Sequence, residues 1–130
     1  KKIATVVDIF LFDFKHYDNE KHLEYTGVPN DMIIKNLIYL NSINKQIILR
    51  CPIIPDINLI EDHFLQIAYL ARDLKNITEV NLLPYHPLGI SKNKKLGKEC
   101  FYNNNDFLEK KELTEYAQMI RNISGKKVIL

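Results

Sequence analysis

Residues 8–14 read DIFLFDF, a run of apolar and aromatic side chains bounded by charge. Runs of this composition between polar residues are typical of β-strands. The run is almost continuously apolar rather than alternating, which is what a strand covered on both faces requires. The stretch therefore predicts one strand of a parallel sheet.

Three further stretches have the same character, and helical patterns lie between them. The further strands are expected at 46–54 (QIILRCPII), 78–84 (TEVNLLP) and 126–130 (KKVIL). Helices are expected after Asn30, after Asn58 and over 107–122, with Asn58 and Glu61 forming a capping-box pattern. The third helix has Asp106 and Glu109 as its cap pair and Gly125 just past its end. This βαβαβαβ order predicts right-handed crossovers and an α/β fold.

Two architectures have this order, an open doubly wound sheet and part of a barrel. No G-x-G-x-x-G follows any strand, which argues against a dinucleotide-binding sheet. A full eight-fold barrel needs about 250 residues, so 130 residues would supply roughly half of one. We expect residues 1–130 to form a single domain, in which the long polar segment 86–106 is too long for an idle connection.

Composition narrows the function classes. The chain is 46% hydrophobic with a net charge of only +2, which gives no sign of a nucleic-acid partner. No apolar run approaches the roughly 20 residues of a membrane helix, and no segment resembles a signal peptide. We therefore expect a cytoplasmic protein without a membrane partner. Cys51 and Cys100 lack metal-like spacing and are expected to be reduced structural thiols.

Charged side chains at the strand ends are the candidate site. Strand alternation puts Ile9, Leu11, Asp13 and Lys15 on one face and the three phenylalanines of 8–14 on the other. Asp13 and Lys15 would then face the crevice or barrel interior at the carboxyl end, where α/β folds place ligand sites. The alternative is an internal ion pair or a polar rim.

The next two strands repeat this arrangement. Arg50 interrupts an apolar strand and must find an acceptor, either Asp13, a helix end or the carboxylate of a ligand. His86 follows the third strand between Pro84 and Pro87. A lone histidine is usually a packing residue, but three successive strands that each end in a polar group favour a site.

The remaining polar residues indicate no metal site. His16, His22 and His63 lack an i,i+4 histidine pair or an acidic partner, and we expect them at the surface. Four lysines between 92 and 98 are most simply a solvated loop, with an electropositive docking rim as the minority interpretation.

Four segments together resemble one family. They are DIFLFDFKHYD, HLEYTGVPNDMIIKNL, RCPIIPDIN and EVNLLPYHPLGISKNKKLG. In this order they are similar to the carboxyl-terminal half of glycyl-radical-enzyme activating enzymes, such as the activating enzyme of pyruvate formate-lyase, within the radical SAM superfamily. The resemblance implies half of an incomplete (βα)6 barrel, a partial TIM barrel that holds a 4Fe–4S cluster and S-adenosylmethionine.

The resemblance also implies roles for the strand-end residues. Asp13 and Lys15 would line the S-adenosylmethionine pocket, Lys15 on the methionyl carboxylate or ribose side and Asp13 at ribose hydroxyls or a monovalent cation. Arg50 would be an inward-facing group on the ligand or substrate side, and His86 would lie near the adenosyl moiety. The implied partners are a glycyl radical enzyme, on which the deoxyadenosyl radical generates a glycyl radical, and an electron donor such as flavodoxin or ferredoxin.

Two departures from the family pattern stand out. The C-x-x-x-C-x-x-C that binds the cluster is absent, and two distant cysteines cannot replace three thiolates from one tight loop. We therefore expect this chain, which opens on KKIATVV without a methionine, to be an inactive fragment of the enzyme. Asp56 replaces the glycine usual after the second proline of R-x-P-x-I-P, so that turn is expected to differ.

Two other functions remain open. A lysine beside an acid at the end of a barrel strand also suits a Schiff-base aldolase that uses Lys15. A non-catalytic binding domain would account for the missing cysteines. An isolated half barrel would leave the strand at 8–14 unpaired on one edge, so we expect the chain to self-associate.

Overall fold

The computed structural model describes residues 2–86 and 107–130. Several residues discussed above, namely Cys100, Asp106 and the lysines between 92 and 98, lie outside these ranges. The elements, in chain order, are η1 (Lys2–Thr5), β1 (Ile9–Asp13), α1 (Asn19–Thr26), α2 (Asp31–Ser42), β2 (Gln46–Ile53), α3 (Glu61–Asp73), β3 (Ile77–Pro84), η2 (Lys110–Leu113), α5 (Thr114–Ser124) and β4 (Lys127–Ile129).

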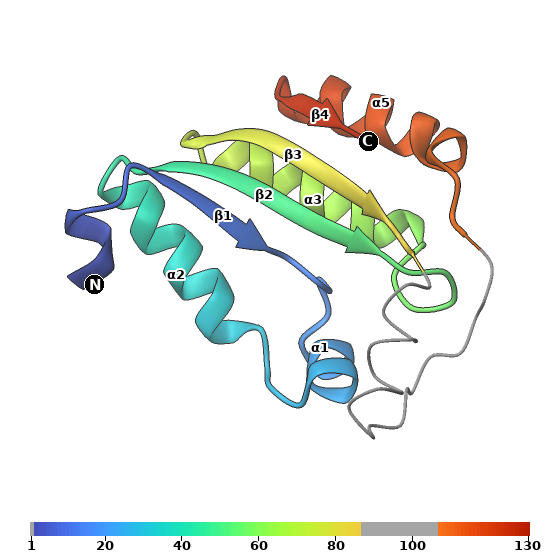
Figure 1. Cartoon of the computed structure of the whole chain (residues 1–130), viewed down its shortest axis with the longest axis horizontal. Coiled ribbons are helices and arrows are strands. Elements are labelled where there is room, and N and C mark those ends of the chain that lie inside the picture. The colour runs from blue at the N-terminus through green and yellow to red at the C-terminus, as the bar shows by residue number, and fades with distance from the viewer. Residues whose placement is uncertain (1, 87–106) are drawn as a thin grey trace.

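The four described strands form one parallel sheet in the order β1-β2-β3-β4. Sequence order and spatial order therefore coincide, as repeated crossovers of one hand require. Figure 1 shows α3 behind β2 and β3, and α1 beyond the carboxyl end of β1. The predicted α/β fold of parallel strands alternating with helices is confirmed.

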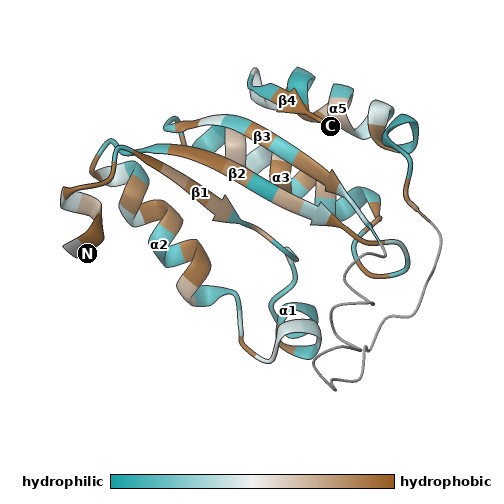
Figure 2. Ribbon diagram, viewed as in Figure 1, coloured by the Kyte–Doolittle hydropathy of each residue, from teal (hydrophilic) through white to brown (hydrophobic). Residues whose placement is uncertain are grey.

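One face of the sheet is buried and the other is open. In β2 the side chains of Ile47, Leu49, Cys51 and Ile53 are fully buried, whereas the residues between them are partly exposed. The buried set forms a single core with apolar residues of α2, α3 and α5. Figure 2 shows that β1 is mostly hydrophobic. Two of its apolar side chains, Ile9 and Leu11, nevertheless lie on the open face and are 49% and 60% exposed. The described helices thus cover one side of the sheet, as expected for part of a barrel.

Packing between α3 and α5 closes the far side of the core. The rings of Phe64 and Tyr116 stack with their centroids 3.9 Å apart, and Phe64 is fully buried. Ala68 and Ala117 are also fully buried in this core. Small residues allow two helices to approach closely, and ridges then fit into grooves.

The starts of two helices differ from the sequence predictions. The N-cap of α3 is Ile60, and no side chain bonds to the first turn, because the amide of Asn58 is used elsewhere. The third predicted helix begins seven residues late, at Thr114, after η2. A capping box of Glu109 and Glu112 starts η2, whereas α5 itself has no side-chain cap, and the predicted cap residue Asp106 lies outside the described residues. Its predicted end is confirmed, since Gly125 has a φ of 67° and caps α5 in the left-handed conformation.

Within residues 2–86 and 107–130, no helix has both the length and the apolar character that crossing a membrane requires.

Candidate functional site

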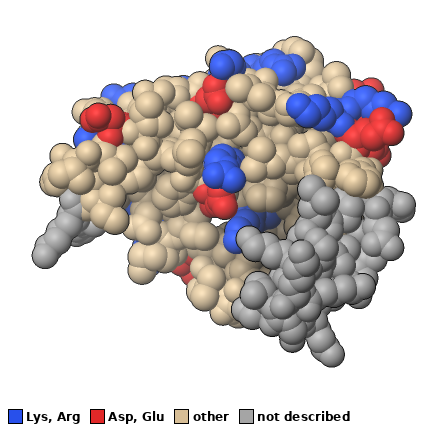
Figure 3. Space-filling model, in the orientation of Figure 1, with Lys and Arg blue, Asp and Glu red and all other residues tan. Residues whose placement is uncertain are grey.

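Asp13 and Arg50 meet on the open face of the sheet. They are register partners where β1 ends, and Arg50 Nε lies 3.5 Å from Asp13 Oδ1. Their side chains are 46% and 41% exposed, so the pair adds at most about 1 kcal/mol to stability. Figure 3 shows basic and acidic atoms in contact near the middle of this face. Among the described residues no other acceptor bonds to the Arg50 guanidinium, so most of its N–H groups can serve a further acceptor.

Lys15 follows Asp13 on the same side of the chain. It is exposed, and among the described residues its ammonium group has no ion-pair partner. Its backbone carbonyl accepts a hydrogen bond from Asn58 Nδ2 at 2.7 Å. A cation with a fixed backbone and a free head group can bind an anionic ligand such as a carboxylate.

Asn81 continues the polar row across the sheet, and sequence analysis missed it. It is the register partner of Arg50 on β3, and its Oδ1 is buried without a hydrogen-bond partner among the described residues. The signal was present, because strand alternation in TEVNLLP puts Asn81 on the face of Arg50. A buried amide oxygen without a partner is costly, which makes Asn81 a further candidate for ligand contact.

His86 packs against an aromatic ring beyond the end of β3. It is exposed two residues beyond the end of β3, and its ring packs edge-on against Phe107 with 4.8 Å between centroids. No hydrogen bond or ion pair joins it to Asp13, Lys15 or Arg50 in the part of the chain that the structure describes. The structure thus brings Asp13 and Arg50 together, places Lys15 beside them, and leaves the role of His86 a prediction.

A pocket of about 1150 Å³ opens between α1 and the loop that joins β2 to α3. Lys15 is part of its wall, so the pocket adjoins the open-face site. Besides Lys15, two groups of residues form the wall. They are, from α1 and the residues beside it, His16, His22, Glu24, Tyr25, Thr26 and Gly27, and from β2 and the following loop, Pro52, Ile54, Asp56, Ile57 and Asn58.

Asp56 occupies a turn in this wall with a φ of 61°. This is the left-handed conformation that glycine adopts without strain and that aspartate tolerates. The family's usual glycine and the aspartate of this chain are therefore both compatible with the turn as observed.

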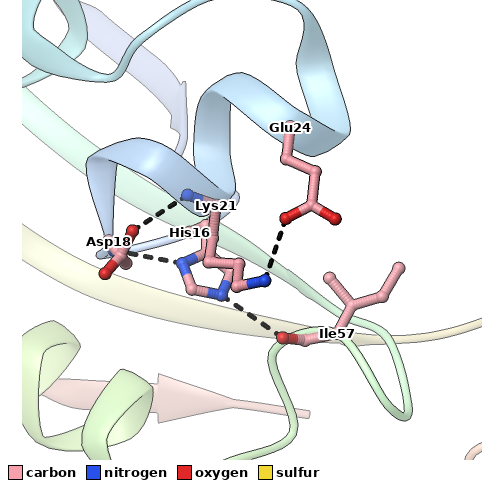
Figure 4. A network of polar contacts seen from close by, with 5 residues as sticks. All are labelled: His16, Asp18, Lys21, Glu24 and Ile57. Atoms are coloured by element: carbon pink, nitrogen blue, oxygen red, sulfur yellow. Dashed lines mark hydrogen bonds and ion pairs between the residues drawn. The ribbon is translucent and has the colours of Figure 1, made fainter.

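The expectation that three histidines lie at the surface is wrong. His16, His22 and His63 are only 3%, 2% and 0% exposed. Backbone groups satisfy both ring nitrogens of His16: the amide of Asp18 donates to Nδ1 at 3.0 Å, and Nε2 donates to the Ile57 carbonyl at 3.3 Å (Figure 4). His22 Nδ1 donates to the Val28 carbonyl at 2.6 Å, whereas its buried Nε2 has no hydrogen-bond partner among the described residues. Ile57 lies 41 residues beyond His16, and a partner so distant leaves no trace in a sequence pattern.

His63 is buried by aromatic packing instead of hydrogen bonds. Its ring stacks on Phe14 and His16 at centroid distances of 5.7 and 5.5 Å, and neither ring nitrogen has a partner among the described residues. Burial, and to a lesser degree the neighbouring His16, lowers the pKa of His63 to about 3. Burial also lowers the pKa of His16. Both rings are therefore neutral at pH 7.

The described thiol does not suit an iron–sulfur cluster. Cys51 is fully buried on the helix-covered face, and burial, helped by the charge of Asp13, raises the pKa of its thiol far above the usual range. Thiolates are the ligands of such clusters, so this side chain is in the wrong protonation state and on the wrong face. Within 2–86 and 107–130 no three His, Cys, Asp or Glu side chains group as metal ligands would.

Comparisons with known proteins give a consistent set of relatives, although no family model matches the chain. It is 37% identical over 123 residues to the choline trimethylamine-lyase activating enzyme of Oleidesulfovibrio alaskensis, and the alignment covers 92% of this chain and 40% of that protein. It is 38% identical over 116 residues to the 4-hydroxyphenylacetate decarboxylase activating enzyme of Clostridioides difficile, covering 88% and 36%. The pyruvate formate-lyase-activating enzyme of Staphylococcus epidermidis is 34% identical over 69% of the chain and 36% of its own length.

The fold has a solved counterpart. A domain of pyruvate-formate lyase-activating enzyme from Bacteroides vulgatus superposes with a TM-score of 0.77 at 21% identity, over 98% of this chain and 69% of that one. The chain spans between a third and two fifths of the length of the curated relatives named above. The homologues of this chain are glycyl-radical-enzyme activating enzymes, as its sequence motifs predicted.

Proposed function

We propose that the carboxyl edge of this sheet binds S-adenosylmethionine, and that the chain works as part of an enzyme that activates a glycyl radical enzyme. One observation carries the proposal. In a chain whose homologues are activating enzymes, Asp13, Lys15 and Arg50 lie at the ends of adjacent parallel strands, on the face that no described helix covers. Ligand sites of α/β folds are built at this edge.

The donor set suits the chemistry of this ligand. The unpaired ammonium of Lys15 would bind the methionyl carboxylate or the ribose side. Asp13 is an acceptor for ribose hydroxyls or for a monovalent cation, and Arg50 would hold it in place through their ion pair. Exposed Ile9 and Leu11 on the same face offer an apolar surface, and His86 is assigned to the adenosyl side. In the intact enzyme the bound ligand would supply radical chemistry: one-electron reduction would release methionine and form a deoxyadenosyl radical, which would take a hydrogen atom from a glycine of the partner.

Because the thiol of Cys51 is buried on the helix-covered face, the residues that the structure describes do not fit the 4Fe–4S cluster. Its ligands are assigned to residues outside this sequence, so the isolated chain is expected to be inactive. The open face and the free edge of β1 support the assignment of the single domain 1–130 to half of a (βα)6 barrel. An electron donor such as flavodoxin or ferredoxin and a cytoplasmic location remain predictions.

The two other functions are less well supported. Lysines that form Schiff bases are activated by a desolvated or cationic environment, whereas Lys15 is exposed and two residues from an acid. Borohydride trapping with a carbonyl substrate would label Lys15 if the aldolase function were correct. A non-catalytic binding domain would require a parent protein without the cluster motif.

Reading the coding sequence upstream and expressing the longer protein tests the proposal. We expect a C-x-x-x-C-x-x-C there, and a glycyl radical signal by electron paramagnetic resonance when the reduced protein meets its lyase and S-adenosylmethionine. Lys15→Ala should abolish the signal, and Lys35→Ala, an exposed lysine on α2, should preserve it. An upstream sequence without the cysteine motif would contradict the proposal.

A further inference from the structure

Lys15 lies just beyond the hydrogen-bond ladder that fixes β1. The register between β1 and β2 ends at Asp13 and Arg50, and the next bond, from the Phe14 amide to the Arg50 carbonyl, is 2.8 Å long. The backbone of Lys15 therefore needs another partner to hold a fixed position. Buried backbone carbonyls in native structures nearly always have one.

The side chain of Asn58 supplies that partner. Its Nδ2 donates to the carbonyl of Lys15 at 2.7 Å and to that of Pro52 at 2.8 Å, and its Oδ1 accepts from the Ile54 amide at 2.7 Å. Only 1% of the residue is exposed. Both amide hydrogens are used and the orientation is fixed, because a flipped amide would set its oxygen against two carbonyl oxygens. Asn58 thus joins the end of β1 to the end of β2.

This use of Asn58 comes at the expense of the following helix. The sequence has a capping-box pattern at Asn58 and Glu61, yet α3 begins without a side-chain cap. An asparagine cap would stabilise the helix by about 1 kcal/mol. The amide instead bonds to a carbonyl 43 residues away in the sequence.

Other groups hold the residues after Lys15. Asn30 Nδ2 donates to the carbonyls of His16 and Tyr17 at 3.1 and 2.9 Å, and Asn30 is only 5% exposed. Figure 4 shows the hydrogen bond from the His16 ring to the Ile57 carbonyl, which ties the segment after β1 to the β2–α3 loop. Asn30 and Asn58 are therefore a matched pair of buried amides with two donated bonds each, of which only Asn58 bonds to Lys15.

We propose that Asn58 is a positioning residue for Lys15. By fixing the Lys15 carbonyl against the end of β2, it directs the ammonium group to a ligand on the edge that Asp13 and Arg50 share. The ligand contact of Lys15 rests on the function proposed above, whereas the fixing of its backbone by Asn58 does not. The two can therefore be tested separately.

Ligand binding tests the coupling of the two residues. S-adenosylmethionine is titrated into the chain and into Asn58→Ala, Lys15→Ala and the double variant, with affinity read by calorimetry or amide shifts. We expect Asn58→Ala to weaken binding about tenfold when Lys15 is present and less than twofold when it is replaced by alanine. An equal loss in both backgrounds would overturn the proposal, because Asn58 would then act without Lys15. If Lys15→Ala itself changes nothing, the assignment of Lys15 in the proposed function fails.

Backbone dynamics test the positioning without any ligand. In Asn58→Ala the order parameter of the His16 amide, which shares a peptide plane with the Lys15 carbonyl, should fall from the roughly 0.85 of rigid backbone to below about 0.6. In Asn30→Ala the loss should fall on the amides of Tyr17 and Asp18 instead. If Asn58→Ala does not fold, Asn58→Ser should show the same change to a smaller degree. A His16 amide that stays rigid in a folded Asn58 variant overturns the proposal, whether or not the chain binds S-adenosylmethionine.

Discussion

Protonation of His63 should destabilise the chain as the pH falls from 7 to 5. The ring is fully buried, and neither nitrogen has a partner among the described residues. Its pKa is lowered by burial, with a smaller effect of His16, from 6.5 to about 3. The unfolded chain therefore binds a proton near pH 6.5 that the folded chain excludes. Stability is lost as the pH falls below 6.5, and the loss is complete near pH 3.

The size of the loss follows from the pKa shift. pH 5 lies about 1.5 units below the pKa of the histidine in the unfolded chain. At about 1.4 kcal/mol per unit, the free energy of unfolding should fall by roughly 2 kcal/mol. His63→Phe replaces the ring with an apolar one that can still stack on Phe14, so most of the loss between pH 7 and 5 should disappear. At pH 7 this variant should be at least as stable as the parent, because the unpaired nitrogens are removed.

Urea unfolding followed by circular dichroism at the two pH values measures this loss. His86→Phe is the matched control, since it replaces an exposed histidine and leaves His63 in place, so this variant should keep the loss. A parent chain equally stable at pH 7 and 5, or a His63→Phe variant that keeps the full loss, would refute the reasoning. His16, whose pKa is also lowered by burial, contributes in the same direction, so a small residual dependence is expected.

Three further predictions concern the turn, the open face and the cluster. Asp56→Gly should stabilise the chain by up to about 1 kcal/mol and Asp56→Ala should destabilise it by about as much, because φ is 61° there; equal urea midpoints for the two variants would contradict this. The isolated chain should self-associate through the open face and the free edge of β1, burying on the order of 1,000 Å² or more, and a monomer in light scattering at micromolar concentration would count against it. Anaerobic reconstitution with iron and sulfide should give neither a stable 4Fe–4S spectrum nor reductive cleavage of S-adenosylmethionine, and a stable spectrum would disprove the conclusion drawn from Cys51.

The strands were predictable because their signal is local. The expected run at 8–14 corresponds to β1 at Ile9–Asp13, and the run at 46–54 to β2 at Gln46–Ile53. Alternation within β1 also placed Asp13 on the open side with Leu11, and the ion pair with Arg50 was one of the partners considered. Side-chain direction in a strand depends only on residue parity, so the sequence determines it.

The predictions of helix caps and of histidine exposure failed where contacts made in the folded chain decide the outcome. Asn58 has the pattern of a helix cap, but carbonyls at the ends of two strands take its amide instead. The buried state of His22 depends on the Val28 carbonyl across a turn, and that of His63 on aromatic rings from another element. The late start of α5 reflects a 3-10 turn at Lys110–Leu113, whose capping box involves Glu109 and Glu112.

Titration of the isotope-labelled chain with S-adenosylmethionine tests the central claim most directly, because it locates the ligand without requiring the cluster. We predict saturable amide shifts that gather at Asp13 to His16 and at Arg50 and Asn81, on the open face where β1, β2 and β3 lie side by side. Lys15→Ala should weaken the binding at least tenfold. Shifts confined to α2 and α5 on the covered side, or no saturable shift at all, would contradict the account.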